Sequence, residues 1–242
     1  MAGDRSTKRS LHGLWQEYQE IFLWSVAGVP RGLSVVGGRS TKRPLRDRWQ
    51  EYQEVFLWSA AGVPRRLSVA REPKGLSVNE AHNVLVACYK AKRIQEYTTH
   101  GTLVRDIRLK AGVTSPWHAV QLTSGHYVVS QNASPGVVSV VTGDGQVVHS
   151  CKTEMKYPTS IAVKQNDLIH VADSANDRIL TMDRILAMDS SLRSVEELAL
   201  PADDEIGLRR PSGLCLDESR GRLYVGEYDG SLRVLVIDNV RL

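Results

Sequence analysis

The chain has 242 residues, of which 42% are apolar, and its formal net charge is +4. This length and composition suffice to bury a core as one domain or as a short array of units, which excludes a disordered chain as the default. Residues 1–72 carry 12 Lys and Arg against 7 Asp and Glu, whereas residues 73–242 carry 19 against 20. The larger part of the chain therefore lacks the excess of cations that a sequence-independent grip on phosphate requires.

The first predicted element is a tandem duplication. Residues 6–36 and 40–70 match at 23 of 31 positions, with an offset of 34 residues. Each copy ends in Pro-Arg-x-Leu-Ser-Val, which is echoed by Pro-Lys-Gly-Leu-Ser-Val at Pro73, so each copy is predicted to be the edge of one unit joined to the start of the next. A copy is too short for a full four-stranded unit. Residues 1–72 are thus a partial, duplicated segment that precedes the regular units of residues 73–242.

The duplicated segment is also rich in aromatic and basic residues, which leaves two interpretations open. Stacking aromatics interleaved with cations suit single-stranded nucleic acid. Aromatic side chains at this spacing also pack between sheets. The residues concerned are Trp15, Tyr18, Trp24, Trp49, Tyr52 and Trp58, with Arg43, Arg46, Arg48, Arg65 and Arg66.

Four later stretches open with a proline followed by a small or aliphatic run. They begin at Pro73, Pro116, Pro158 and Pro211, so the steps are 43, 42 and 53 residues. The last step is long partly because residues 178–183 are echoed at once by residues 184–189, which predicts a small insertion in one unit. A recurring period in this range indicates stacked structural units.

Each unit is predicted to contain four short strands. In the third unit, apolar runs at 161–163, 168–173 and 178–182 are separated by a turn at 165–167 and a loop at 174–177. A helical solenoid would need stretches of about 10 to 15 residues with helical periodicity, and residues 73–180 contain none. The sequence therefore predicts an all-β fold, a β-propeller of four-stranded blades, with about four clear blades and partial N-terminal ones.

These units resemble a known repeat. The run Pro158-Thr-Ser-Ile-Ala-Val and the later run Val171-Ala-Asp-Ser-Ala-Asn-Asp-Arg-Ile are similar to the NHL repeat, the blade unit of the C-terminal propellers of tripartite-motif NHL proteins. The resemblance covers residues 73–242 and fades where Gln131 replaces an acidic residue. NHL propellers commonly have about six blades, so the resemblance leaves closure of the ring undecided and implies a truncated or divergent member, or one that associates with another chain. Open sheet edges would favour self-association.

A loop rim is the predicted binding surface. In propellers, the loops between second and third strands share one rim with the loops that join successive blades, and binding residues concentrate on such loops. The candidate binding residues are Tyr89, Lys90, Lys92, Trp117, His118, Asn132, Asn176, Arg209, Arg210 and Tyr228.

The resemblance implies that this rim recognises a protein partner, like the substrate-recognition end of tripartite-motif NHL ubiquitin ligases. The sequence contains no RING or B-box spacing of Cys and His, so this chain alone is not expected to ligate ubiquitin. RNA binding by the same rim is the alternative, with cations on phosphate and Trp117 and Tyr228 stacked on unpaired bases.

Catalysis is not predicted, because no Ser/His/Asp constellation and no Gly-rich phosphate loop can be recognised. Asp173 and Glu227 are interpreted as partners of nearby arginines in structural ion pairs. A third hypothesis makes them metal ligands of a hydrolase resembling the lactonase propellers, but Cys88 and Gln131 stand at the corresponding positions of other units. We therefore expect no enzyme, no catalytic residue, no metal and no cofactor.

The cysteines and the N-terminus predict the cellular setting. Cys88, Cys151 and Cys215 are widely spaced and form no C-x-x-C pair, so neither a disulfide framework nor a zinc knuckle is expected. The polar N-terminus and the short apolar run at 21–29 predict neither a secretion signal nor a membrane span. A cytoplasmic location without membrane contact is the expectation.

Overall fold

The computed structural model describes residues 20–24, 32–38, 52–58, 64–182, 195–198 and 207–237. Strands and tight turns account for most of these residues, together with two short 3-10 helices, η1 (Ser174–Asn176) and η2 (Glu218–Arg220). None of the helices within these ranges could cross a membrane. The echoed run at 184–189 lies outside the described residues.

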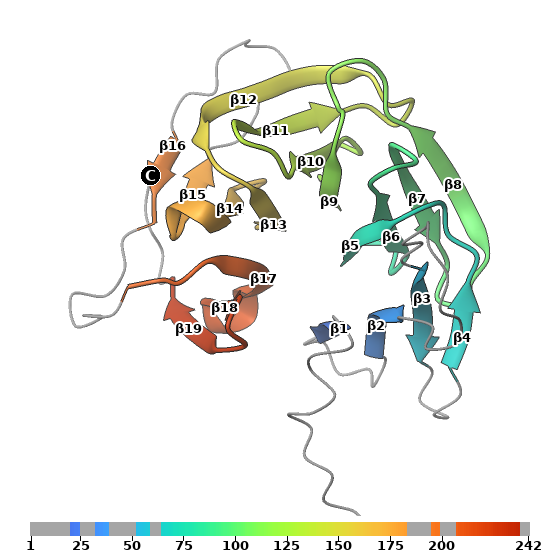
Figure 1. Ribbon diagram of the computed structural model, residues 1–242, viewed down its shortest axis with the longest axis horizontal. Coiled ribbons are helices and arrows are strands. Elements are labelled where there is room, and N and C mark those ends of the chain that lie inside the picture. Colours follow the sequence, from blue (N-terminus) through green and yellow to red (C-terminus); the bar gives the residue numbers. More distant parts are fainter. Residues whose placement is uncertain are drawn as a thin grey trace, which may run out of the picture.

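The strands form antiparallel sheets arranged around a central axis, with one strand of each sheet near the axis and the last strand at the periphery (Figure 1). The all-β propeller predicted from the sequence is thus confirmed. Four blades lie in residues 73–237 and one further sheet lies N-terminal to them. We number the blades 1 to 5 in chain order.

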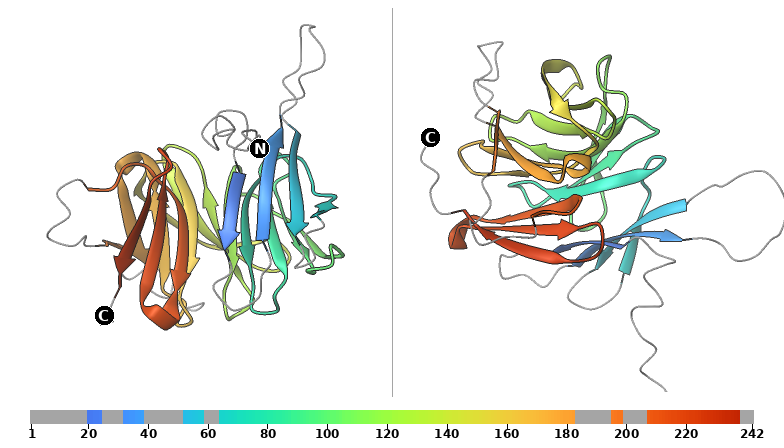
Figure 2. Two further views of the ribbon diagram at one scale, coloured as in Figure 1. Left: turned by 90° about the horizontal axis from the view of Figure 1, so that it is seen from below. Right: turned by 60° about the vertical axis from the view of Figure 1, so that its left-hand side comes forward.

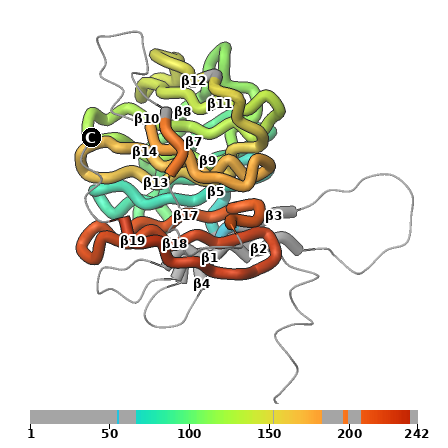
Figure 3. The backbone as a smooth tube through the Cα atoms, turned by 90° about the vertical axis from the view of Figure 1, so that its left-hand side faces the viewer, coloured from blue at the N-terminus to red at the C-terminus, as the bar shows by residue number. Residues whose placement is uncertain are grey.

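The strand bounds follow the proline-led repeat. Blade 2 contains β5 (Pro73–Val78), β6 (Val84–Cys88), β7 (Arg93–Tyr97) and β8 (Leu103–Arg108). Blade 3 contains β9 (Pro116–Gln121), β10 (Tyr127–Gln131), β11 (Gly136–Val141) and β12 (Val147–Met155). Blade 4 contains β13 (Pro158–Val163), β14 (Ile169–Asp173), β15 (Arg178–Met182) and β16 (Val195–Glu197). Blade 5 contains β17 (Pro211–Asp217), β18 (Arg222–Glu227) and β19 (Leu232–Val236), and lies beside blade 4 (Figure 3).

Blade 1 is built from both copies of the N-terminal duplication. The first copy supplies β1 (Glu20–Trp24) and β2 (Gly32–Gly38), and the second supplies β3 (Tyr52–Trp58) and β4 (Pro64–Leu67). The four strands pair in chain order into one sheet, which stands next to blade 2 (Figure 2). Each short copy therefore contributes one hairpin, and two hairpins make a blade. Trp24, Tyr52 and Trp58 belong to these strands by their backbone alone, and Trp15, Tyr18 and Trp49 lie outside the described residues, so the structure does not test the two interpretations of the aromatic side chains.

The apolar core is divided into layers, each between two neighbouring blades. Val84, Val86 and Cys88 of β6 pack with Val55 and Leu67 of blade 1. The intervening residues of β6 face the opposite way and pack with blade 3. Because successive side chains of a strand alternate between its two faces, a strand buried on both faces must be apolar throughout. This explains why the second strands of the units are continuous apolar runs.

The cysteines belong to this core. Cys88 and Cys151 are buried free thiols, and Cys215 is half-buried. Burial raises the pKa of the Cys88 thiol to about 12. Because the thiolate is the reactive form, Cys88 is inert at neutral pH.

His170 on β14 makes the stability of the fold depend on pH. Its side chain is buried, and Nδ1 lies 3.1 Å from Thr181 Oγ1, whereas Nε2 has no partner among the described residues. Burial, aided by the positive charge of Lys164, lowers the pKa of His170 from 6.5 to about 4. Folding therefore disfavours the protonated imidazole of His170, whereas the unfolded chain accepts the proton at the ordinary pKa.

We expect the free energy of unfolding of the His170→Asn variant to fall less between pH 7 and pH 4 than that of the natural chain. The folded-state pKa lies below the unfolded value, so the contribution of this residue is present above about pH 6.5 and is lost as the pH falls toward about 4. Urea unfolding at pH 7, 6, 5 and 4 measures the effect. His82→Asn, at an exposed histidine, is the control. Parallel acid profiles for the natural chain and the His170 variant would contradict the assignment.

Candidate functional site

In the rim, the loop between the second and third strands of a blade is joined by a recurring backbone hydrogen bond to the loop that enters the same blade from the preceding one. The residue after the second strand donates its N–H to the carbonyl of the residue before the inner-strand proline. These bonds are Tyr89 to Glu72 (2.8 Å), Asn132 to Ser115 (3.2 Å) and Tyr228 to Arg210 (3.1 Å), and in blade 4 Ala175 donates to Lys156 (3.1 Å). The loop rim is therefore one surface, in which the bond occupies equivalent positions in blades 2, 3 and 5 and is shifted by one residue at each end in blade 4.

A buried carboxylate fixes the rim loops in blade 4. Asp173 has no exposed surface, and its oxygens accept hydrogen bonds from Lys156 N (2.6 Å), Asn176 Nδ2 (2.8 Å) and Arg178 Nε (2.8 Å). One side chain thus ties the second strand, the following loop and the loop from the preceding blade together. We call this arrangement the rim clip. It gives a physical reason for the Asp-Ser-x-Asn-x-Arg pattern.

Blade 5 repeats the rim clip with a longer acid. Glu227 accepts from Arg209 N (2.6 Å), Arg233 Nε (3.1 Å) and the hydroxyl of Ser231. Burial of the carboxyl is the largest single effect and raises the pKa of Glu227, but these hydrogen bonds and the charge of Arg233 together outweigh it, so the pKa lies below its ordinary value. Both acids therefore serve their own blades as ion-pair partners. Among the residues that the structure describes, no group of three or more His, Cys, Asp or Glu is placed to hold a metal ion.

Blades 2 and 3 keep the clip without a carboxylate. In blade 3, Gln131 Oε1 accepts from Thr114 N (2.8 Å) and Nε2 donates to Gly112 O (3.0 Å). In blade 2, Cys88 is too short, and Gln95 of the third strand takes over by accepting from Ala70 N (2.7 Å). Gln95 was missed by sequence reasoning, because it lies outside the aligned position.

An aromatic cluster lies where blades 2 and 3 meet. Lys74 Nζ is 5.0 Å from the ring centroid of Trp117, and the Tyr89 ring meets Trp117 edge-on with centroids 6.3 Å apart. We call these three residues the Trp117 cluster. Lys74 was not among the sequence candidates, although it follows Pro73 as Trp117 follows Pro116 and could have been found from that repeat position.

A second aromatic cluster lies on blade 5. The Arg210 guanidinium stacks 4.4 Å from the ring centroid of Tyr228, and 64% of Tyr228 is exposed. We call this pair the Tyr228 cluster. Arg209 is exposed beside it. The rim loops thus carry aromatic rings flanked by cations in two places, where blades 2 and 3 meet and on blade 5.

The other sequence candidates have varied surroundings. Lys90 is exposed and forms an ion pair with Glu72, and Lys92 is exposed. Asn132 is half-buried, and the amide of Asn176 is engaged in the rim clip. The rim loops are therefore held mainly by their own polar groups.

His118 does not lie on the rim surface, which corrects the expectation for this residue. Its side chain is buried between inner strands, where Nε2 lies 2.9 Å from Leu76 O of blade 2 and Nδ1 accepts from Ile161 N of blade 4 at 3.2 Å. Burial lowers the pKa of His118, which keeps the ring neutral. Both nitrogens are thus used to join three blades, and neither is available to a partner.

Comparison with known proteins places the chain among the β-propellers. No protein-family model and no curated protein matches the sequence. Among solved structures, a protein of unknown function from Bacteroides caccae aligns with a TM-score of 0.62 at 15% identity, covering 85% of this chain and 74% of that one. A chain of a nidogen/laminin complex aligns with a TM-score of 0.61 at 12% identity, covering 85% of this chain and 72% of that one.

A third similar structure corrects the exclusion of catalysis. Virginiamycin B lyase from Staphylococcus aureus aligns with a TM-score of 0.51 at 12% identity, covering 92% of this chain and 89% of the lyase. The fold is therefore shared by an enzyme and by a propeller solved in complex with another protein. The expectation that the chain is no enzyme was wrong, because it treated the absence of familiar motifs as evidence about a fold that carries enzymes as well.

Proposed function

We propose that the loop rim binds a protein partner and that the Trp117 and Tyr228 clusters are its main contacts. Aromatic and arginine side chains contribute most of the binding energy in protein interfaces. The observation that carries the proposal is the Tyr228 cluster, in which a largely exposed ring is held under Arg210 on a loop that a buried carboxylate fixes. A fixed loop loses little conformational freedom on binding, which favours affinity.

We also propose that the blades of residues 73–237 are of the NHL type. The rim clip supports this assignment, because it gives the Asp, Asn and Arg of the Asp-Ser-x-Asn-x-Arg pattern a role in holding one loop. In blades 2 and 3, where the pattern fades, amide side chains take the place of the carboxylate.

A protein partner is favoured over RNA by the charge distribution of the clusters. One face of the Trp117 ring and one face of the Tyr228 ring are covered by cations of this chain, which leaves less ring surface for stacked bases. Lys90 is neutralised by Glu72. RNA binding is therefore treated as an alternative outcome of the experiment below.

Tyr228→Ala combined with Trp117→Ala is expected to reduce capture of the partner at least about tenfold, because each ring is a candidate hot spot worth about 2 kcal/mol or more. Captured proteins are quantified by mass spectrometry after affinity purification from cell extract. Tyr228→Ala alone removes an exposed ring and should leave the melting temperature unchanged.

Leu103→Ala is the control, since Leu103 is 47% exposed on the outer strand β8, away from the rim. Unchanged capture by the double variant would refute the rim as the interface. Loss of the captured proteins after ribonuclease treatment, with a steep salt dependence, would favour RNA instead.

A further inference from the structure

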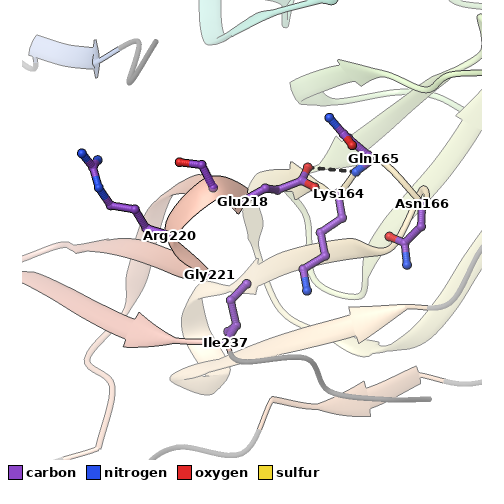
Figure 4. Close-up of a pocket in the computed structure, with 8 residues that line it drawn as sticks. Lys164, Gln165, Asn166, Glu218, Arg220, Gly221 and Ile237 are labelled. Carbon is purple, nitrogen blue, oxygen red and sulfur yellow. Dashed lines mark hydrogen bonds between the residues drawn. The ribbon is translucent and has the colours of Figure 1, made fainter. Parts of the chain in front are cut away.

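A polar cavity lies on the face of the propeller opposite the loop rim (Figure 4). It is formed by the turn between β13 and β14 and by η2, which joins β17 to β18. These turns connect first strands to second strands, so they stand at the other ends of the strands from the rim loops. The cavity has a volume of about 560 Å³, within the range of about 300 to 1,000 Å³ that is typical of small-molecule sites.

The walls of the cavity are fixed from three blades. Glu218 Oε1 accepts from Gln165 N at 2.9 Å, which joins η2 of blade 5 to the turn of blade 4. The same turn is anchored to blade 3 by Asp167, whose buried carboxylate accepts from Thr123 N (3.2 Å) and Thr123 Oγ1 (2.8 Å). The site is therefore formed before any ligand arrives, and little ordering is required for binding.

Two opposite charges face this cavity without forming an ion pair with each other. Lys164 comes from blade 4 and Glu218 from blade 5, and within the described ranges Lys164 forms no ion pair. The hydrogen bond to Gln165 N holds the Glu218 carboxylate in place, while the Lys164 side chain extends away from that carboxylate (Figure 4). The third charged residue is already engaged, because Arg220 pairs with Asp217 at 2.9 Å and points away from Lys164.

The remaining lining supplies a polar donor and an apolar wall. Asn166 Oδ1 accepts from Leu168 N at 3.2 Å, so its amide nitrogen remains the group with protons to donate. Ile237 lines another side with aliphatic carbon. A ligand of a single sign would bring its charge close to one side chain of the same sign, which costs binding energy. A ligand with both signs and an apolar part matches all of these groups.

We propose that this cavity binds a small zwitterion with the chemistry and size of an amino acid or dipeptide. The ligand carboxylate lies against Lys164 and the Asn166 amide, its ammonium lies against Glu218, and its side chain packs toward Ile237. This site is independent of the loop rim.

The test uses glycylleucine as the zwitterionic probe and two analogues that each lack one charge. N-acetylglycylleucine has no ammonium, and glycylleucinamide has no carboxylate. Titration of the ¹⁵N-labelled full chain should shift the amide signals of Gln165 and Gly221 saturably with glycylleucine. Each analogue should bind about tenfold more weakly, since each loses one charged contact.

Two variants assign the contacts. Lys164→Gln should weaken glycylleucine binding about tenfold and leave glycylleucinamide binding unchanged. Glu218→Gln retains an acceptor for Gln165 N. It should weaken the binding of glycylleucine and glycylleucinamide, which carry an ammonium, and leave the binding of N-acetylglycylleucine unchanged. Lys110→Gln, at an exposed lysine paired with Asp144, is the control and should bind like the natural chain. The proposal would be overturned by any of three results. These are the absence of saturable shifts, equal affinity for the three peptides, and an equal loss of glycylleucine affinity in all three variants.

Discussion

Replacement of Asp173 by alanine is expected to lower the free energy of unfolding by about 3–5 kcal/mol. The carboxylate is fully buried, and its removal takes the acceptor from Lys156 N and breaks the ion pair with Arg178. The Asn176 amide and the Arg178 guanidinium each lose one acceptor and keep the carbonyl of Glu154 as another. Buried donors that lose a partner cost their full desolvation energy. Urea denaturation followed by tryptophan fluorescence and by circular dichroism measures the change.

Asp144→Ala is the matched control for the rim clip. Asp144 also forms an ion pair, with Lys110 at 2.8 Å, but 63% of its side chain is exposed. Solvent screens such pairs, so this variant should unfold like the natural chain. An equal fall in the free energy of unfolding for Asp173→Ala and Asp144→Ala would show that burial of the rim clip adds nothing to stability.

Replacement of Gly75 by alanine is the second change with a large expected effect. A Cβ atom at this position would lie 2.5 Å from Trp117 O, 2.5 Å from His118 Cδ2 and 2.7 Å from His118 Cα. Backbone atoms cannot rotate aside, so inner strands β5 and β9 must separate. Overpacking of this kind costs about 1–3 kcal/mol and occasionally more. We expect the upper end, because separating these strands would also lengthen the 2.9 Å bond between His118 Nε2 and Leu76 O. Differential scanning calorimetry measures the lowered melting temperature.

Blade 5 provides the control for this prediction. Gly213 holds the same position after Pro211 that Gly75 holds after Pro73, and a Cβ there would meet no atom within 4 Å. Gly213→Ala should therefore leave the melting temperature nearly unchanged. A similar fall in both variants would mean that loss of glycine itself, rather than the distance between blades 2 and 3, controls stability.

The architecture could be predicted from the sequence because it depends on local, repeated features. Prolines mark the start of the inner strands, and continuous apolar runs such as 84–88 indicate strands that are buried on both faces. Both features recur once in each blade. Exposed aromatics next to cations, such as Tyr228 with Arg210, could also be found from their loop position.

The positions that sequence reasoning missed depend on contacts between blades. Nothing in the local sequence distinguishes His118 from a loop residue, since its burial results from two strands that lie 42 and 43 residues away along the chain. Gln95 replaces the missing acid of blade 2 from a different strand. The pairing of the two N-terminal copies into a single sheet likewise depends on long-range register.

The layered core determines how cooperativity is distributed in this molecule. Each apolar layer is shared by only two adjacent sheets, and blade 3 contributes to one layer with blade 2 and another with blade 4. Free energy is therefore gained one neighbour at a time, as in a linear chain of coupled elements. A sequence change within one layer is felt by the two sheets that share it, which leaves the surfaces of more distant blades free to diverge.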